Sequence, residues 1–215
     1  MGKRVGVLGS GDVAKTLAKG FVAKGYEVMI GSRDPKKLAD FAKEAGVLYG
    51  SFPETASHGE ILVLAVKGTA AIEAISLAGE ANLSGKLVFD TTNPIAESPP
   101  VNGVLVYFTG PNDSLMERLQ KAQPKTFFVK AWNSIGNAYM VDPKFPGGPP
   151  TMFIAGDNDG AKKEATEILT AFGWGAEDMG KVESARAIEP LCQLWCAPGM
   201  LRKQWSHAFK LLKPA

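Results

Sequence analysis

The chain has 215 residues, which suits one large domain or a domain with a small addition. Its formal net charge is only +2 and it has no long basic run, which argues against nucleic acid as a partner. The longest apolar run, residues 61–66, is far shorter than the ~18 residues that cross a bilayer. We therefore expect a cytoplasmic protein without a membrane partner.

Short apolar runs alternate with amphipathic stretches along most of the chain. The run at residues 61–66 is apolar at every position, which is typical of a parallel strand covered on both faces. This alternation predicts a doubly wound α/β sheet of the Rossmann type. The predicted strands cover residues 3–9, 27–32, 61–66, 86–90, 126–132 and 151–155, and the predicted helices cover residues 13–21, 35–46, 69–81, 114–122 and 161–172.

The last part of the chain is expected to form a small, mostly helical lobe. We place the Rossmann domain at residues 1–182 and the lobe at residues 183–215, with a helix over residues 184–212 that Pro198 should break or kink. The lobe is rich in apolar side chains, which favours a homodimer interface, although packing against its own sheet is the alternative. Cys192 and Cys196 lie four residues apart in this lobe. Buried free thiols are favoured for them, because two ligands do not make a zinc site.

A glycine turn follows the first predicted strand. Gly9 permits a tight turn, Gly11 lets the backbone approach a pyrophosphate, and Ala14 takes the position of the third glycine in the dinucleotide fingerprint. Backbone N–H groups at the start of the next helix would then point at the phosphates. The predicted pyrophosphate-binding residues are Gly9, Ser10, Gly11, Asp12 and Val13.

The end of the second predicted strand indicates which dinucleotide is bound. An NAD site normally has Asp or Glu here, whereas this chain has Ser32 and Arg33 after Gly31. A hydroxyl and a guanidinium suit the 2′-phosphate of NADP, which a carboxylate would repel. Lys36 and Lys37 either add charge to this site or merely begin a solvated helix, and Asp34 is interpreted as the cap of that helix.

The other strand ends supply further candidates, because ligands of doubly wound sheets bind at the carboxyl ends of the strands. Polar contacts with the nicotinamide half are expected from Asn93, Asn133 and Ser134, although each could instead only cap a strand. For Lys67, a contact with the cofactor and a surface position are equally open. The candidates at these strand ends are Ala65, Val66, Lys67, Asn93, Asn133 and Ser134.

No side chain stands out as a catalytic acid or base. His58 precedes its strand and belongs to the wrong edge of the sheet, while His207 lies in the tail. Lys130 and Tyr139 form no recognised acid–base pair. We therefore expect no catalytic side chain and no metal, and a hydride acceptor that needs little proton transfer from the protein, such as a flavin or deazaflavin ring.

A family resemblance covers nearly the whole chain. It rests on GSGDVAKTLAKGFVAKGYEVMIGSRDPKKL, DTTNP, KAWNSIGN, AGDNDGAKK and the tail that begins RAIEPLCQLWC. In these segments the chain resembles the NADPH-dependent coenzyme F420 reductase-like family. The resemblance implies direct hydride transfer from nicotinamide to deazaflavin, and dimers formed through the C-terminal region. It also implies phosphate-binding roles for Ser10, Ser32, Arg33 and Lys36, and a position beside the nicotinamide and acceptor for Ile135, Gly136 and Asn137.

Three interpretations remain open. The first is an NADPH-dependent oxidoreductase whose acceptor is a deazaflavin, a flavin or a similar ring; a ferric reductase domain of the same scaffold uses a flavin. The second is an NADP-binding sensor or regulatory protein without turnover. The third is a hydroxy-acid or imino-acid dehydrogenase, which ranks last because the tail is too short for the long helical domain of such enzymes.

Overall fold

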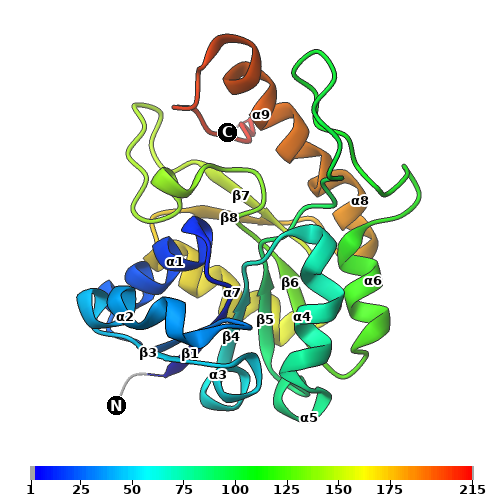
Figure 1. Cartoon of the computed structure of the whole chain (residues 1–215). Helices are drawn as coiled ribbons and strands as arrows, with labels where there is room; N and C mark the ends of the chain where they lie inside the picture. Colours follow the sequence, from blue (N-terminus) through cyan, green and yellow to red (C-terminus); the bar gives the residue numbers. More distant parts are fainter. Residues whose placement is uncertain (1–2, 215) are drawn as a thin grey trace.

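A six-stranded parallel sheet forms the centre of the computed structural model, which describes residues 3–214 (Figure 1). The strand order is β3-β2-β1-β4-β5-β6, so the order reverses between β1 and β4. This arrangement confirms the doubly wound sheet and opens a crevice at the carboxyl ends of these strands. The strands are β1 (Arg4–Leu8), β2 (Glu27–Gly31), β3 (Leu48–Gly50), β4 (Ile61–Leu64), β5 (Leu87–Asp90) and β6 (Phe127–Lys130).

Helices cover both faces of the sheet. Alternate residues of β4 serve different cores: Val63 belongs to one apolar cluster, whereas Leu62 and Leu64 belong to the other. This is the two-sided burial that an all-apolar strand predicts. One face is covered by α1 (Asp12–Ala23), α2 (Ala39–Ala45) and α7 (Asp159–Ala171), and the other by α3 (Phe52–His58), α4 (Ala71–Ala78), α5 (Glu80–Leu83) and α6 (Leu115–Ala122).

Two predicted helices are shorter and less regular than expected. Residues Pro35–Leu38 form a 3-10 turn before α2, and the side chain of Asp34 makes no capping hydrogen bond. The interpretation of Asp34 as a cap is therefore wrong; its carboxylate instead lies 3.3 Å from Lys37 Nζ. The helix predicted over residues 69–81 is interrupted at Gly79, whose φ of +87° separates α4 from α5.

A second, smaller sheet lies beyond β6. Strands β7 (Thr151–Ile154) and β8 (Gly175–Asp178) pair in parallel with each other, and one antiparallel bridge from Ala155 to Lys130 connects them to β6. The strand and the helix predicted after residue 150 are both present, as β7 and α7, but β7 belongs to this second sheet and not to the main one. Strand β8 was missed because its sequence, GAED, has no apolar run.

The C-terminal part is helical only as far as Arg202. It contains α8 (Ala185–Ile188) and α9 (Pro190–Arg202), and residues 203–214 have no regular secondary structure (Figure 1). The helix predicted to residue 212 is wrong there, because Lys203 takes φ +57° and ends α9. Pro198 lies inside α9 rather than ending it. The final segment packs on β7 instead, where Thr151 N donates to Phe209 O at 2.9 Å.

Within residues 3–214, none of the helices combines the length and apolar character that crossing a bilayer requires.

Candidate functional site

The crevice at the reversal of strand order is a cleft with two adjoining cavities. The larger cavity has a volume of about 690 Å³ and the smaller about 530 Å³. Both are lined by Gly11 from the β1–α1 turn and by Ala65, Val66 and Lys67 from the turn after β4. The glycine turn therefore stands between the two halves of one cleft, where a dinucleotide would place its pyrophosphate.

The glycine turn is shaped for close approach. Gly9 has φ +148°, and a Cβ there would lie 2.1 Å from the carbonyl oxygen of Ala65, so only glycine fits. A Cβ on Gly11 would meet nothing within 4 Å, because this residue faces the open cleft. No side chain caps the first N–H groups of α1, which leaves these donors and the positive end of the helix for an anion.

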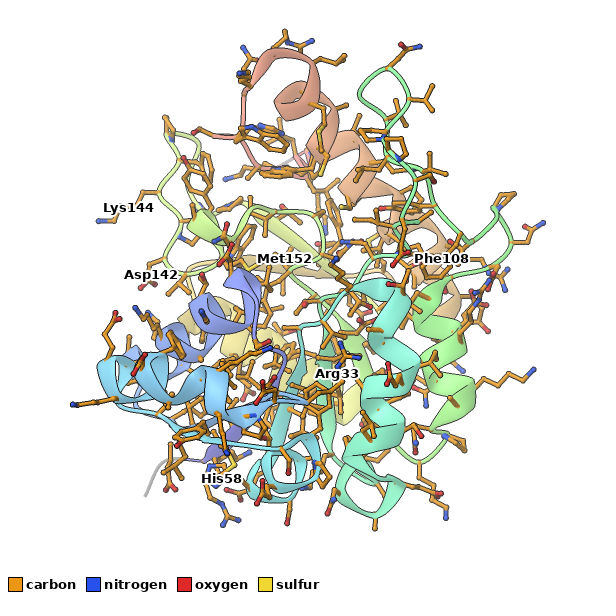
Figure 2. The ribbon with its side chains drawn as sticks, in the orientation of Figure 1. Arg33, His58, Phe108, Asp142, Lys144 and Met152 are labelled. Atoms are coloured by element: carbon orange, nitrogen blue, oxygen red, sulfur yellow. The ribbon has the colours of Figure 1, made fainter. Side chains whose placement is uncertain are left out.

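The smaller cavity carries the basic residues. It is lined by Ser32 and Arg33 after β2 and by Lys37 from the following turn. Figure 2 shows Arg33 beside α4, where its Nη1 lies 3.5 Å from the Glu73 carboxylate. Lys36, in contrast, is exposed and lines neither cavity.

Carboxylates face two of the three cations that line the smaller cavity, which are Arg33, Lys37 and Lys67. Glu73 approaches Arg33, and Asp34 approaches Lys37, and all four residues line the cavity. The sequence analysis did not single out Glu73, because its position on α4 gives no sign that α4 faces the end of β2.

The larger cavity is lined by both polar and apolar groups. Thr91, Thr92 and Asn93 follow β5 along one wall, and Asp12 also lines this half of the cleft. A Cβ on Gly68 would lie 1.9 Å from the carbonyl oxygen of Asn93, so the turns after β4 and β5 touch. The apolar side chains that line it are Val13, Val66 and Ile95.

Asn133 lies behind this wall. It is buried and lines neither cavity, but its Nδ2 donates to Asn93 Oδ1 at 3.1 Å and to the carbonyl oxygen of Ile188 at 3.1 Å. Asn93 Nδ2 donates in return to the carbonyl oxygen of Asn133 at 2.7 Å. Asn133 therefore fixes the amide of Asn93, which is the residue that reaches the cleft.

Ser134 and Ile135 are buried and line neither cavity. Next to them, the ring of Trp195 from α9 packs against Gly136, since a Cβ on that glycine would lie 2.7 Å from the ring. Trp195 Nε1 donates to the carbonyl oxygen of His207 at 2.8 Å, and the two rings stack with centroids 5.0 Å apart.

A charged cluster behind Thr92 escaped the sequence analysis. Lys130 ends β6, and its Nζ lies 2.7 Å from Asp90 at the end of β5 and 2.8 Å from Glu189. The strand register places Asp90 opposite Lys130. The sequence did offer a signal for the Asp90–Lys130 pair, because each residue ends a buried strand. Glu189 is too distant in sequence to be connected with either of them.

The histidines lie away from the cleft. His58 ends α3 at the amino-terminal edge of the sheet, and Figure 2 shows it near the bottom of the view, well below Arg33. His207 packs on Trp195 in the final segment. Neither residue lines the two cavities.

Both cysteines are free thiols, with Sγ atoms 4.0 Å apart. Cys192 is buried, and its hydrogen bond with Cys196 together with burial raises the pKa of the Cys192 thiol. Cys196 is only half-buried, so the expectation of burial holds for one of the two. Within residues 3–214 there is no group of three or more His, Cys, Asp or Glu side chains placed to hold a metal ion.

Comparison with known proteins identifies the family. The model for coenzyme F420-dependent NADP oxidoreductases matches residues 4–94. The crystal structure of a candidate F420-dependent NADP-reductase from Arthrobacter sp. FB24 superimposes with a TM-score of 0.92 and is 31% identical, covering 99% of this chain and 100% of that one. The chain belongs to the F420-dependent NADP oxidoreductase family.

Curated relatives fall into two groups. The F420-dependent NADP reductase of Methanothermobacter marburgensis is 29% identical over 89% of this chain and 90% of the relative. Metalloreductase STEAP3 of Rattus norvegicus is 34% identical over 92% of this chain, but this chain spans only 39% of its length. One group is named for F420-dependent NADP reduction and the other for the reduction of metals.

Proposed function

We propose that this protein is an NADPH-dependent oxidoreductase that transfers hydride to a deazaflavin, a flavin or a similar ring. The observation that carries the proposal is the divided cleft, with a basic cavity on one side of the glycine turn and a partly apolar cavity on the other. This division matches the two halves of NADP, since one nucleotide carries the 2′-phosphate and the other carries the nicotinamide.

The adenosine half belongs in the smaller cavity. Ser32 Oγ and the guanidinium of Arg33 would hold the 2′-phosphate, with Lys37 rather than Lys36 as the added cation. The uncapped N–H groups at the start of α1 would bind the pyrophosphate beside Gly9, Ser10 and Gly11.

The nicotinamide half belongs in the larger cavity, whose volume lies within the usual range for small-molecule sites. Asn93, held by Asn133, offers an amide to the nicotinamide side, and the apolar side chains there exclude water. NADPH, when bound, supplies a hydride, which carries two electrons and one proton.

The chain's own contribution is to hold two rings together. No titratable side chain takes an acid–base role in this proposal, because the second proton needed by the acceptor ring comes from water. Catalysis then depends on proximity and orientation. The relatives named F420-dependent NADP reductase support a deazaflavin, and the metalloreductases indicate that other acceptors are used within the same fold.

Replacing Arg33 tests the cofactor assignment. Arg33→Ala should weaken NADPH binding by about 10- to 150-fold, because a charge-assisted hydrogen bond contributes roughly 1.5–3 kcal/mol. NADH, which lacks the 2′-phosphate, should bind almost unchanged. Fluorescence titration measures both affinities.

Lys36→Ala is the matched control, since it removes a neighbouring cation that lines neither cavity. Equal losses for NADPH and NADH in Arg33→Ala would show that Arg33 does not bind the 2′-phosphate. A screen of ring acceptors with the parent protein then tests turnover; NADPH binding without turnover would favour a sensor.

We further propose a homodimer that forms through the lobe at residues 183–215, in a cytoplasmic protein. The lobe exposes large apolar side chains, including 60% of Leu194 and 56% of Leu201. Such a concentration on one helix and its following segment favours an interface.

A further inference from the structure

The three charged groups behind the larger cavity form ion pairs with one another. Lys130, Asp90 and Glu189 have side chains that are 0–2% exposed, so none of them can be solvated by bulk water. Burial alone would lower the pKa of Lys130, but the two carboxylates outweigh burial and raise it, so the ammonium stays charged. Glu189 also accepts from Leu115 N and Met116 N, both at 3.0 Å, at the start of α6.

This cluster holds one turn of the cleft. Besides its two ion pairs, Lys130 Nζ donates a hydrogen bond to the carbonyl oxygen of Thr92 at 2.9 Å. Asp90 Oδ1 accepts from Thr92 N at 2.9 Å and from Thr92 Oγ1 at 2.6 Å. Charged groups therefore fix both sides of the Thr92 backbone, and Thr92 and Asn93 line the larger cavity.

The same cluster connects this turn to the C-terminal helices. Glu189 directly precedes α9, which carries Trp195 against Gly136. The carbonyl oxygen of Ile188, one residue earlier, accepts from the Asn133 amide that holds Asn93. Ile188 and Glu189, just before α9, therefore bind the residues that hold the Thr92–Asn93 wall of the larger cavity.

We propose that Lys130 is a positioning residue for the nicotinamide half of the cleft. A buried ion cluster is a poor way to stabilise a core, because apolar side chains of the same size do so without losing hydration. Here the contacts of the cluster converge on the turn that lines the cavity. This inference deepens the proposed function and rests on the nicotinamide occupying the larger cavity.

Lys130→Met tests the proposal, since it keeps much of the side-chain length and removes the charge. We compare NADPH with 2′,5′-ADP, which has the adenosine half and the 2′-phosphate but no nicotinamide. NADPH should bind about tenfold more weakly to the variant, through loss of order at Thr92 and Asn93. The affinity for 2′,5′-ADP should not change.

Lys162→Met is the matched control. Lys162 also has little exposure and pairs with two carboxylates, with Nζ 2.9 Å from Asp178 and 3.2 Å from Asp159, although these carboxylates are exposed and Lys162 lines neither cavity. A general effect of replacing a paired lysine by methionine should appear in both variants. We expect Lys162→Met to bind NADPH and 2′,5′-ADP with the parent affinities.

Glu189→Gln provides a second variant if Lys130→Met does not fold. It leaves the pair of Lys130 with Asp90 in place, so NADPH should weaken less, again with 2′,5′-ADP unchanged. Parent-like NADPH binding in folded Lys130→Met, or an equal loss of both ligands, would overturn the proposal. If Lys130→Met does not fold, parent-like binding of both ligands by Glu189→Gln would do the same. Failure of the parent to reduce any ring acceptor would contradict the proposed function alone, because this comparison measures only binding.

Discussion

At the scale of single residues, the proposed 2′-phosphate site holds a carboxylate beside its arginine. The Glu73 carboxylate lies 3.5 Å from the Arg33 guanidinium, and both side chains are largely exposed. A 2′-phosphate must therefore displace Glu73 before it pairs with Arg33. Glu73→Gln should tighten NADPH binding by about two- to fivefold, the scale of an exposed ion pair, and leave NADH unchanged. Parallel titrations measure this difference, and an unchanged NADPH affinity would show that Glu73 does not compete.

The histidines provide a second prediction at this scale. His58→Ala and His207→Ala should leave turnover within a few-fold of the parent, because neither side chain lines the cavities. His207→Ala should still lower thermal stability, since its ring stacks on Trp195. A loss of turnover of about 100-fold in folded His207→Ala with normal NADPH binding, the scale of acid–base catalysis, would favour a dehydrogenase mechanism instead.

Most of the site residues predicted from the sequence line the cleft, because the glycine turn and the strand ends are local signals. Gly11, Arg33, Lys67 and Asn93 all line the cleft as a strand-end pattern predicts. The sequence could not show whether Lys36 or Lys37 faces the cavity, because the 3-10 turn at Pro35–Leu38 determines the direction of each side chain. Asn133 is a different case: its amide turns inward to Asn93, which depends on a contact between distant strand ends.

At the scale of elements, one ion pair joins the C-terminal part to the sheet layers. Arg186 Nε on α8 donates to both carboxylate oxygens of Glu117 on α6, at 3.0 and 3.1 Å. The hydrogen bonds from Arg186, and with them that from Ser114, lower the pKa of Glu117. Because the pKa of Glu117 is lower in the folded than in the unfolded protein, the ion pair contributes fully to the free energy of unfolding at neutral pH. This contribution is lost as the pH falls through the folded-state pKa.

Glu117→Gln should therefore reduce the free energy of unfolding by about 1 kcal/mol at pH 7, since the pair is partly exposed. The difference from the parent should shrink as the pH falls below 4.5, the ordinary pKa of a glutamate carboxyl. Urea titrations across this range measure both values, with Glu167→Gln, an exposed position on α7, as the control. A difference that stays constant with pH would contradict the assigned role of Glu117.

The prediction of helices and strands failed where the local sequence pattern was weak or where tertiary contacts outweighed it. Strand β3 has three residues, two of them exposed, so it carries no apolar run. Helix α3 was missed although Ser51 and Glu54 form a capping box that the sequence displays. Residues 203–214 look amphipathic, yet they follow an αL turn at Lys203 and pack along β7. Tertiary contacts determine that segment more than its helical propensity.

At the scale of the whole molecule, the exposed apolar side chains of the C-terminal part predict self-association. Light scattering at micromolar concentration should report a dimer. Leu194→Asp should shift the protein to a monomer, because it places a charge in the expected interface, and NADPH binding should persist. Leu48→Asp changes a comparably exposed leucine on β3, which lies outside the proposed interface and lines neither cavity, and serves as the control. A monomeric parent would contradict the homodimer.

The central claim is direct hydride transfer from NADPH to a ring held in the larger cavity. The most direct measurement uses NADPH deuterated at the transferred position, with a deazaflavin as acceptor and mass spectrometry of the reduced ring. Direct transfer predicts that the deuterium appears on the acceptor ring, because the proximity of the two rings leaves no step at which the label meets water. NADPH that binds tightly but is not oxidised by any ring acceptor, or label that is lost to solvent, would contradict it.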